Sequence, residues 1–190
     1  MNKKGLFGRL RRTSSSPEDG GKRERGAALV EFAFIAPLFF LVVFGGIEIG
    51  LMFRSYLALE STSRSVARVA SIERDDPMAD EAVLNRIDQL VAPLQGDVTH
   101  VIIYKADALD SELPAGCETG SQVGVCTTYV VTDGDVAMGA PSGGIGWNST
   151  TRNEFDNVGI HIIFEYTYAT GFFDTLTLSS TTVEVIERNF

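Results

Sequence analysis

The feature that most constrains this chain is an apolar segment, residues 27–53, with only two charged side chains, Glu31 and Glu48. As an α-helix it is long enough to cross a bilayer, which takes roughly 20 apolar residues at about 1.5 Å each. We therefore predict a transmembrane helix over residues 27–53 that continues as a helical stalk over residues 54–72. A buried helix of a soluble core would explain neither this length nor the step in charge that precedes it.

Charge is unevenly distributed around this segment. Residues 1–26 hold 8 of the 16 Lys and Arg residues but 3 of the 25 acids, so the remainder carries 8 basic and 22 acidic residues. Basic residues beside a membrane helix keep that side in the cytoplasm, so we expect everything after about residue 54 to face outward. The acidic body argues against nucleic-acid binding, which needs a basic surface. An ordinary signal peptide is the alternative, but the apolar region is long and no Ala-x-Ala site follows it.

Individual positions in the apolar segment carry further expectations. Glu31 is costly there, about 2.5–3.5 kcal/mol on insertion scales, so a partner is expected. The alternative is a carboxylate that snorkels to the headgroups. Pro37 removes a helix hydrogen bond and should kink the span, while Gly45 and Gly46 permit close helix approach or bending. We place Glu48 near the outer interface and expect it to be solvated.

A glycine after a basic leader, then four residues, a glutamate and an apolar helix, is similar to the processing site of type IV pilin-like proteins. Residues 26–71, GAALVEFAFIAPLFFLVVFGGIEIGLMFRSYLALESTSRSVARVAS, more closely resemble the TadE-like family of minor pseudopilins from tight-adherence (Flp) pilus systems. Pro37, GGIEIG at 45–50 and the ARVAS ending are part of this resemblance. It implies a pilin-like plan and removal of the leader, residues 1–26, by prepilin peptidase between Gly26 and Ala27.

The resemblance also suggests a role for Glu31. Cleavage would create an α-amino group on Ala27, about one helical turn from the Glu31 carboxylate. In a helical stack, Glu31 would pair with the Ala27 amine of a neighbouring subunit and set the register between subunits.

The function implied is that of a minor pseudopilin for tight-adherence pilus assembly, a structural protein without enzymatic activity. It would lie in the bacterial inner membrane, with its N-terminus cytoplasmic and its head outward, and would enter or prime the pilus. Its partners would be membrane lipid, the prepilin peptidase, other pilins and pseudopilins, and the inner-membrane assembly platform. The alternative is an unprocessed single-pass membrane protein whose outward head binds a partner or an envelope component.

Residues 73–190 are predicted to form an extracytoplasmic α+β head. Asp76 suits the N-cap and Pro77 the first position of a second, short helix. We expect a small antiparallel sheet packed against the stalk and this helix, with a long loop, residues 133–157. The apolar face expected for the second helix consists of Val83, Leu84, Ile87, Leu90 and Val91. The strands expected from β-branched and aromatic content are 98–106, 126–132, 158–168 and 180–188.

Two cysteines, Cys117 and Cys126, lie close together in the head. Zinc needs about four ligands, and neither His100 nor His161 is near them in sequence. We predict a disulfide, since bridges persist in oxidising compartments, with inert thiols or a metal or redox site as the alternatives.

The head carries no motif of a catalytic or cofactor site. Gly-x-Ser-x-Gly, His-Glu-x-x-His and a phosphate-binding glycine loop do not occur, so we predict no enzyme, cofactor or metal. Both histidines are expected to be packed or on the surface. TDGDV, residues 132–136, is expected to be a turn, with calcium ligation as the alternative. Asn148-Ser149-Thr150 matches a glycosylation sequon, and Trp147 is either a contact residue or a local plug.

Overall fold

The computed structural model describes residues 20–73, 76–132, 134–153, 156–171 and 174–186, with side chains described from Gly26 onward. The predicted α+β class is confirmed. The chain divides into two compact units, Met1–Gly45 and Gly46–Phe190, which are described separately. The elements in chain order are α1 (Gly20–Glu73), α2 (Ala79–Val91), β1 (Gly96–Ala106), β2 (Cys126–Val130), η1 (Val136–Met138), β3 (Ala140–Pro141), η2 (Ser149–Thr151), β4 (Asn157–Tyr166) and β5 (Leu176–Val185).

Helix α1 begins at Gly20, seven residues before the start predicted for the span. The Lys, Arg and Glu residues before Gly26 are good helix formers. The helix therefore continues into the charged sequence that precedes the apolar segment. Pro37 lies inside the helix. The described part of α1 from Gly26 is long and apolar enough to cross a membrane, by length and composition. Its apolar N-terminal part therefore fits a single-pass membrane protein.

The connection between the helices differs in detail from the prediction. Helix α1 ends at Glu73, before Asp76 as expected. Helix α2, however, starts at Ala79 rather than at Pro77, with Met78 at its N-cap. The Asp76 Oδ1 atom accepts a hydrogen bond from the Met78 backbone N–H at 2.8 Å. Such a bond to the residue two positions on forms an Asx turn, so Asp76 caps the turn that precedes the helix and not the helix itself.

The sheet has the strand order β3-β2-β1-β4-β5, and every neighbouring pair is antiparallel. All four predicted strands are present, with their ends shifted by a few residues. The two-residue strand β3 lies within the loop predicted for residues 133–157 and was not foreseen. Strands β1 and β4 lie inside the sheet and are mostly buried, whereas β5 forms one edge and its residues, except Ser180, are exposed or partly buried.

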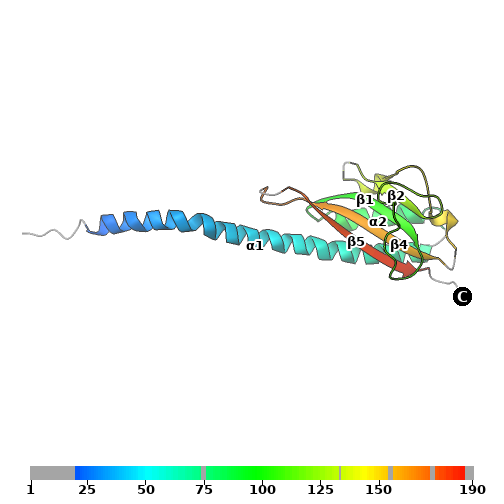
Figure 1. Ribbon diagram of the computed structural model, residues 1–190, viewed down its shortest axis with the longest axis horizontal. Coiled ribbons are helices and arrows are strands. Elements are labelled where there is room, and N and C mark those ends of the chain that lie inside the picture. The colour runs from blue at the N-terminus through cyan, green and yellow to red at the C-terminus, as the bar shows by residue number, and fades with distance from the viewer. Residues whose placement is uncertain (1–19, 74–75, 133, 154–155, 172–173, 187–190) are drawn as a thin grey trace, which may run out of the picture. The chain divides into compact units, whose positions relative to one another are not determined.

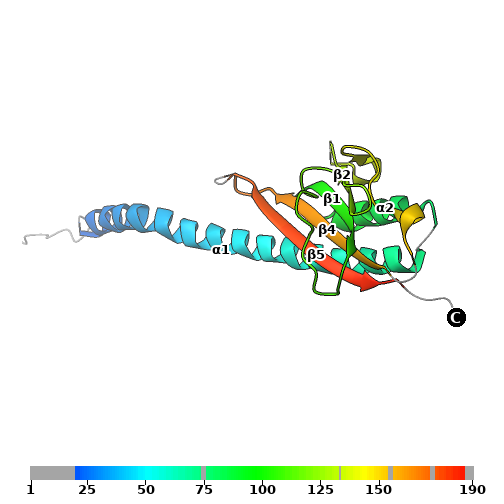
Figure 2. The same ribbon diagram turned by 45° about the vertical axis from the view of Figure 1, so that its right-hand side comes forward.

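Helix α2 and the C-terminal half of α1 cover one face of the sheet, as predicted (Figure 1). Strand β5 runs beside α1 in both views (Figure 2). There, Ser63 on α1 is hydrogen-bonded to Ser180 at 2.8 Å and Thr182 at 2.7 Å. The apolar core between these layers includes Leu59, Val66, Ala67 and Ala70 of α1, Val83, Leu84 and Ile87 of α2, and Val101, Ile103, Ile160, Ile162 and Phe164 of the sheet.

A second, smaller cluster lies on the opposite face of the sheet. It joins Ile102, Tyr104 and Ala106 of β1 to the two cysteines. The Tyr104 ring lies against Gly159 of β4, where an added Cβ would come within 2.2 Å of a ring carbon. Only glycine, which has no Cβ, leaves space for the Tyr104 ring at this position. Burial raises the pKa of the Tyr104 hydroxyl to about 12.

Candidate processing and assembly site

Gly26 and Ala27 lie on an exposed part of α1. A Cβ added to Gly26 would meet no described atom within 4 Å. The peptide bond that joins them is therefore not shielded by described side chains packed over it.

Glu31 follows Ala27 by four residues, so the two lie on the same face of the helix, one turn apart. Its carboxylate is exposed, and among the described residues it has no hydrogen-bond or ion-pair partner. The apolar side chains around it are also exposed: Leu29 69%, Phe32 62% and Ile35 62%. In an apolar medium, such a carboxylate needs a partner from outside the described part of the chain.

The described residues offer no packing contact that would require proline at position 37 or glycine at positions 45 and 46. Pro37 and Gly46 are exposed, and a Cβ at either glycine would meet nothing within 4 Å. The two glycines therefore leave a patch of helix backbone open, the kind of surface that another helix can approach closely.

Glu48 is buried, with 3% of its surface exposed, so the expectation of a solvated side chain is wrong. Its Oε1 accepts hydrogen bonds from the Ala169 backbone N–H at 2.7 Å and from the Tyr166 hydroxyl at 3.3 Å. Its Oε2 accepts one from the Thr170 backbone N–H at 3.3 Å. The chain between β4 and β5 returns to α1 at this point, a long-range contact that helix spacing alone does not indicate.

A buried ion pair in the head was not foreseen from the sequence. Asp80 in the first turn of α2 pairs with Arg152, directly after η2, and the Arg152 side chain has no exposed surface. Asp80 Oδ2 also accepts hydrogen bonds from the Tyr129 hydroxyl and the Ser149 backbone N–H, both at 3.3 Å. Burial lowers the pKa of Arg152, and Asp80 opposes this effect. Burial and the Asp80 charge both raise the pKa of Tyr129.

This ion pair holds the segment that ends the long loop against α2. Arg152 also lies over the ring of Trp147, 5.2 Å from its centroid. Trp147 is 2% exposed, so it is a local plug and not a surface contact residue. Arg152 is the one basic residue among residues 133–157, which is the sequence signal that could have marked it.

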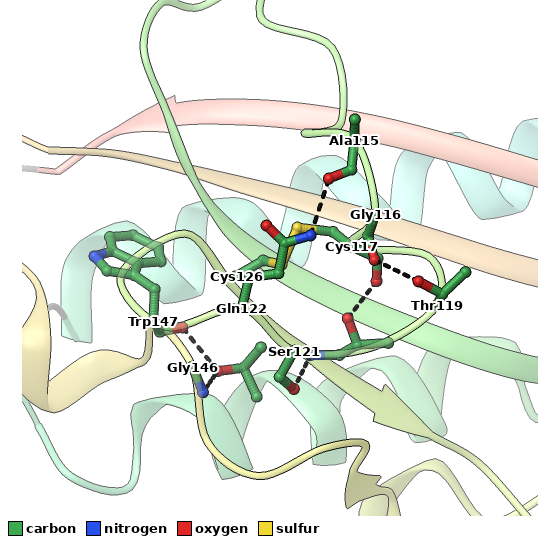
Figure 3. The surroundings of a disulfide bond; sticks show 11 residues. Ala115, Gly116, Cys117, Thr119, Ser121, Gln122, Cys126, Gly146 and Trp147 are labelled. Carbon is green, nitrogen blue, oxygen red and sulfur yellow. Dashed lines mark hydrogen bonds between the residues drawn. A yellow bond between two sulfur atoms is a disulfide. The ribbon is translucent and has the colours of Figure 1, made fainter.

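The predicted disulfide between Cys117 and Cys126 is confirmed, with 6.2 Å between the two Cα atoms. Figure 3 shows how hydrogen bonds brace the loop that it closes. Thr128 Oγ1 donates to the Cys117 carbonyl at 2.5 Å, and Gln122 Nε2 donates to the Ala115 carbonyl at 2.9 Å. The braced loop packs against Ile102, Tyr104 and Ala106 on the face of the sheet that the helices leave open.

The remaining candidates are structural where the structure describes them. His161 is buried, and its Nδ1 is hydrogen-bonded to Thr181 Oγ1 at 2.6 Å. Burial lowers the pKa of this histidine. His100 is partly exposed, with Nδ1 3.1 Å from Thr99 Oγ1. Asn148 caps η2 through a reciprocal pair of hydrogen bonds with Thr151.

The calcium alternative for residues 132–136 rests partly on Asp133, which lies outside the described residues. Gly134 has φ +75°, as a turn requires. Within the described ranges, no group of three or more His, Cys, Asp and Glu side chains is placed to hold a metal ion.

Comparison with known families gave one match. Residues 26–68 match the family model described as TadE-like protein, so the resemblance is confirmed over this segment. The match begins at the glycine of the predicted processing site and covers most of α1, leaving the head outside it. Comparisons with curated proteins and with solved structures found no match.

Proposed function

We propose that this chain is a minor pseudopilin that takes part in assembling a tight-adherence pilus. The TadE-like match at residues 26–68 carries the proposal. Such a match indicates a pilus-associated structural protein with an N-terminal apolar helix, whose partners are other proteins of the pilus system. The match starts at Gly26, and within it Glu31 lies on an exposed apolar helix, so the features of a pilin-like N-terminus occur together.

In this proposal, α1 spans the inner membrane with its N-terminus in the cytoplasm and the head outward. The basic leader supports this orientation, because Lys and Arg beside a membrane helix favour the cytoplasmic side. The disulfide supports an outward head, since bridges persist in oxidising compartments.

Maturation is the first step of the proposed function. Prepilin peptidase cuts between Gly26 and Ala27 and removes the basic residues that hold the leader in the cytoplasm. The exposed position of Gly26, where an added Cβ would have no described atom within 4 Å, is compatible with access of a peptidase.

Assembly is the second step. The new Ala27 amine of one subunit pairs with the Glu31 carboxylate of its neighbour, and the assembly platform adds the subunits. Glu31 is exposed and has no ionic partner among the described residues, so it is available for such a pair. Because an unpaired charge is costly in hydrocarbon, the pair would favour assembly over dispersal in lipid.

The test is N-terminal sequencing of the protein from cells that contain the peptidase. The mature chain should begin AALVEF, and Gly26→Ala should abolish conversion to the shorter form. Gly46→Ala is the matched control, because it adds the same methyl group to the same exposed helix and should be processed normally. A full-length N-terminus in these cells would instead support the unprocessed single-pass alternative.

The assembly step has its own test. Glu31→Val should leave membrane insertion intact, as measured by carbonate extraction, but should impair piliation. Glu31→Asp, which keeps the charge, should restore part of it. Normal piliation by Glu31→Val would contradict the register role of Glu31.

A further inference from the structure

The turn between β4 and β5 lies against α1 at Glu48. Its described residues are 167–171 and 174–175, and we call these the β4–β5 turn. Ala169 and Thr170 donate their backbone N–H groups to the Glu48 carboxylate, at 2.7 and 3.3 Å. The Tyr166 hydroxyl, at the end of β4, donates to the same carboxylate at 3.3 Å.

This contact satisfies both partners at once. A carboxylate in surroundings of low polarity needs hydrogen-bond donors, and a turn there needs acceptors for its backbone N–H groups. Glu48 receives three donors, and the two turn N–H groups receive an acceptor. The turn is thereby suited to surroundings less polar than water.

The position of Glu48 along α1 places this contact near a membrane boundary. From Ala27 to Ile47 the helix is about 30 Å long at 1.5 Å per residue, close to the thickness of the hydrocarbon core. Ile47, Ile49 and Phe53, which flank Glu48 on α1, are all more than half exposed, so the apolar surface continues past it. If the hydrocarbon begins at Ala27, its thickness of about 30 Å ends near Ile47, and Glu48 lies at its outer edge.

The exposed apolar surface of α1 continues past Glu48 before charged residues appear on the helix. After Tyr56 and Leu57, the next large apolar side chain exposed on α1 is Ile72, near the end of the helix. Glu60 and Arg64, one turn apart, then form an ion pair with the Arg64 side chain 68% exposed. From Glu48 to Leu57 the helix rises about 14 Å, about twice the roughly 5–8 Å of one polar headgroup layer, so the exposed apolar surface extends through that layer.

We propose that the β4–β5 turn is a membrane-interface contact that lies in the headgroup layer on the outward side. Lipid headgroups surround its exposed residues, Thr167, Ala169 and Gly171, while Glu48 satisfies its backbone. The part of α1 that crosses the hydrocarbon then ends near Ile47 and not at Phe53. This proposal requires membrane insertion of α1 but neither leader cleavage nor pilus assembly.

A lipid-quenching measurement on the full-length protein tests it. The two native cysteines are bridged, so Ala169→Cys introduces a single reactive thiol for an environment-sensitive fluorophore. The labelled protein is reconstituted in phosphatidylcholine–phosphatidylglycerol vesicles that contain a lipid with a nitroxide on its headgroup. We expect the nitroxide to remove most of the emission.

Leu109→Cys is the matched control. Leu109 is 62% exposed and follows β1 at the end of the sheet opposite the β4–β5 turn, since Ala106 pairs with Asn157 and Gly96 with Tyr166. Its label should keep its emission. Adding Glu48→Ala to Ala169→Cys should reduce the quenching, with circular dichroism used to verify that the head stays folded.

Two results would overturn the proposal. One is equal quenching of the labels at positions 169 and 109. The other is a blue-shifted label at position 169 that the nitroxide lipid does not quench, which would mean that protein and not lipid covers the turn. Both readouts come from chains that retain Glu48, so neither depends on the stability of the Glu48 variant.

Discussion

The two halves of α1 belong to one helix but have opposite surroundings. In residues 26–47 the large apolar side chains are exposed, as Phe34 at 79% and Leu41 at 70% illustrate. In residues 48–73 the apolar side chains Leu59 and Val66 are completely buried against the head. The first half thus has an apolar surface that the described chain does not cover, whereas the second half buries one apolar face against the head and leaves side chains such as Phe53 and Leu57 exposed. Apolar content predicts a helix in both halves, but only the contacts show which half needs lipid or another helix.

The two acids in this helix differ in the same way. Glu31 is exposed and has no partner among the described residues, whereas Glu48 is buried and accepts three hydrogen bonds. An acid in an apolar helix is therefore not evidence of a single role. Glu48 connects the head to α1 through these hydrogen bonds, whereas the proposed role of Glu31 needs a partner from another subunit.

The variant with the largest expected effect should destabilise the head without changing how the apolar half of α1 inserts in the membrane. Asp80→Ala leaves the Arg152 charge buried and removes an acceptor from Tyr129 and Ser149. Breaking a buried pair in this way costs about 3–5 kcal/mol. Thermal unfolding should therefore move to clearly lower temperature, followed through the emission of Trp147, the single tryptophan.

The control for this prediction is Glu81→Ala, the neighbouring exposed acid on α2, which should change stability by no more than about 0.5 kcal/mol. Carbonate extraction should show that both variants stay in the membrane. Loss of membrane insertion in Asp80→Ala would contradict the independence of the two halves.

A smaller effect should distinguish the two acids directly. Glu48→Ala leaves the N–H groups of Ala169 and Thr170 without their acceptor, and unsatisfied groups cost about 1–3 kcal/mol, so the head should be destabilised by about that amount. Glu31→Ala should leave the stability of the head unchanged, because Glu31 makes no described contact with it. Denaturant unfolding of both variants in the same detergent is the measurement. Equal destabilisation would contradict the contrast between these residues.

The third effect concerns the disulfide, which constrains the head alone. Replacing both Cys117 and Cys126 by alanine removes a short-loop bridge, for which the chain-entropy model gives roughly 2.5 kcal/mol. The denaturation midpoint should fall, and the native protein should fall to a similar midpoint under reducing conditions. A double variant whose midpoint still responds to the reductant would show that the effect of the reductant has another origin.

The fold was predictable from the sequence where its signals are local. β-Branched runs marked the four long strands, the apolar spacing of Val83, Ile87 and Val91 marked α2, and the short spacing of the cysteines indicated their bridge. β3 was missed because two residues in a glycine-rich loop carry no periodicity.

The site was less predictable because its contacts join distant residues. Asp80 and Arg152 are 72 residues apart, and Glu48 and Ala169 are 121 apart. Nothing in the sequence around either acid specifies which donor it meets. Gly26 and Glu31 could be identified from the sequence because the pattern that joins them spans six residues and does not depend on how the head folds.

The smallest effect is a pH dependence that should appear in the head and not in the apolar half of α1. Burial lowers the pKa of His161 from its ordinary 6.5, and the charge of Glu118 opposes this only in part. Between the folded and the ordinary pKa, the unfolded chain binds more protons than the folded one. Stability should therefore fall as pH drops below about 6.5, by at most about 1.4 kcal/mol per pH unit.

Unfolding midpoints between pH 7.5 and pH 5 should show this loss for the native protein but not for His161→Gln. His100→Gln, which changes the other histidine, should keep it. Asp156 acts at lower pH: burial tends to raise its pKa, but hydrogen bonds from Lys105 and Asn153 lower it below the usual 3.8. Its contribution to stability is therefore lost only in strong acid. A pH dependence retained by His161→Gln in this range would place the responsible group outside the buried face around His161.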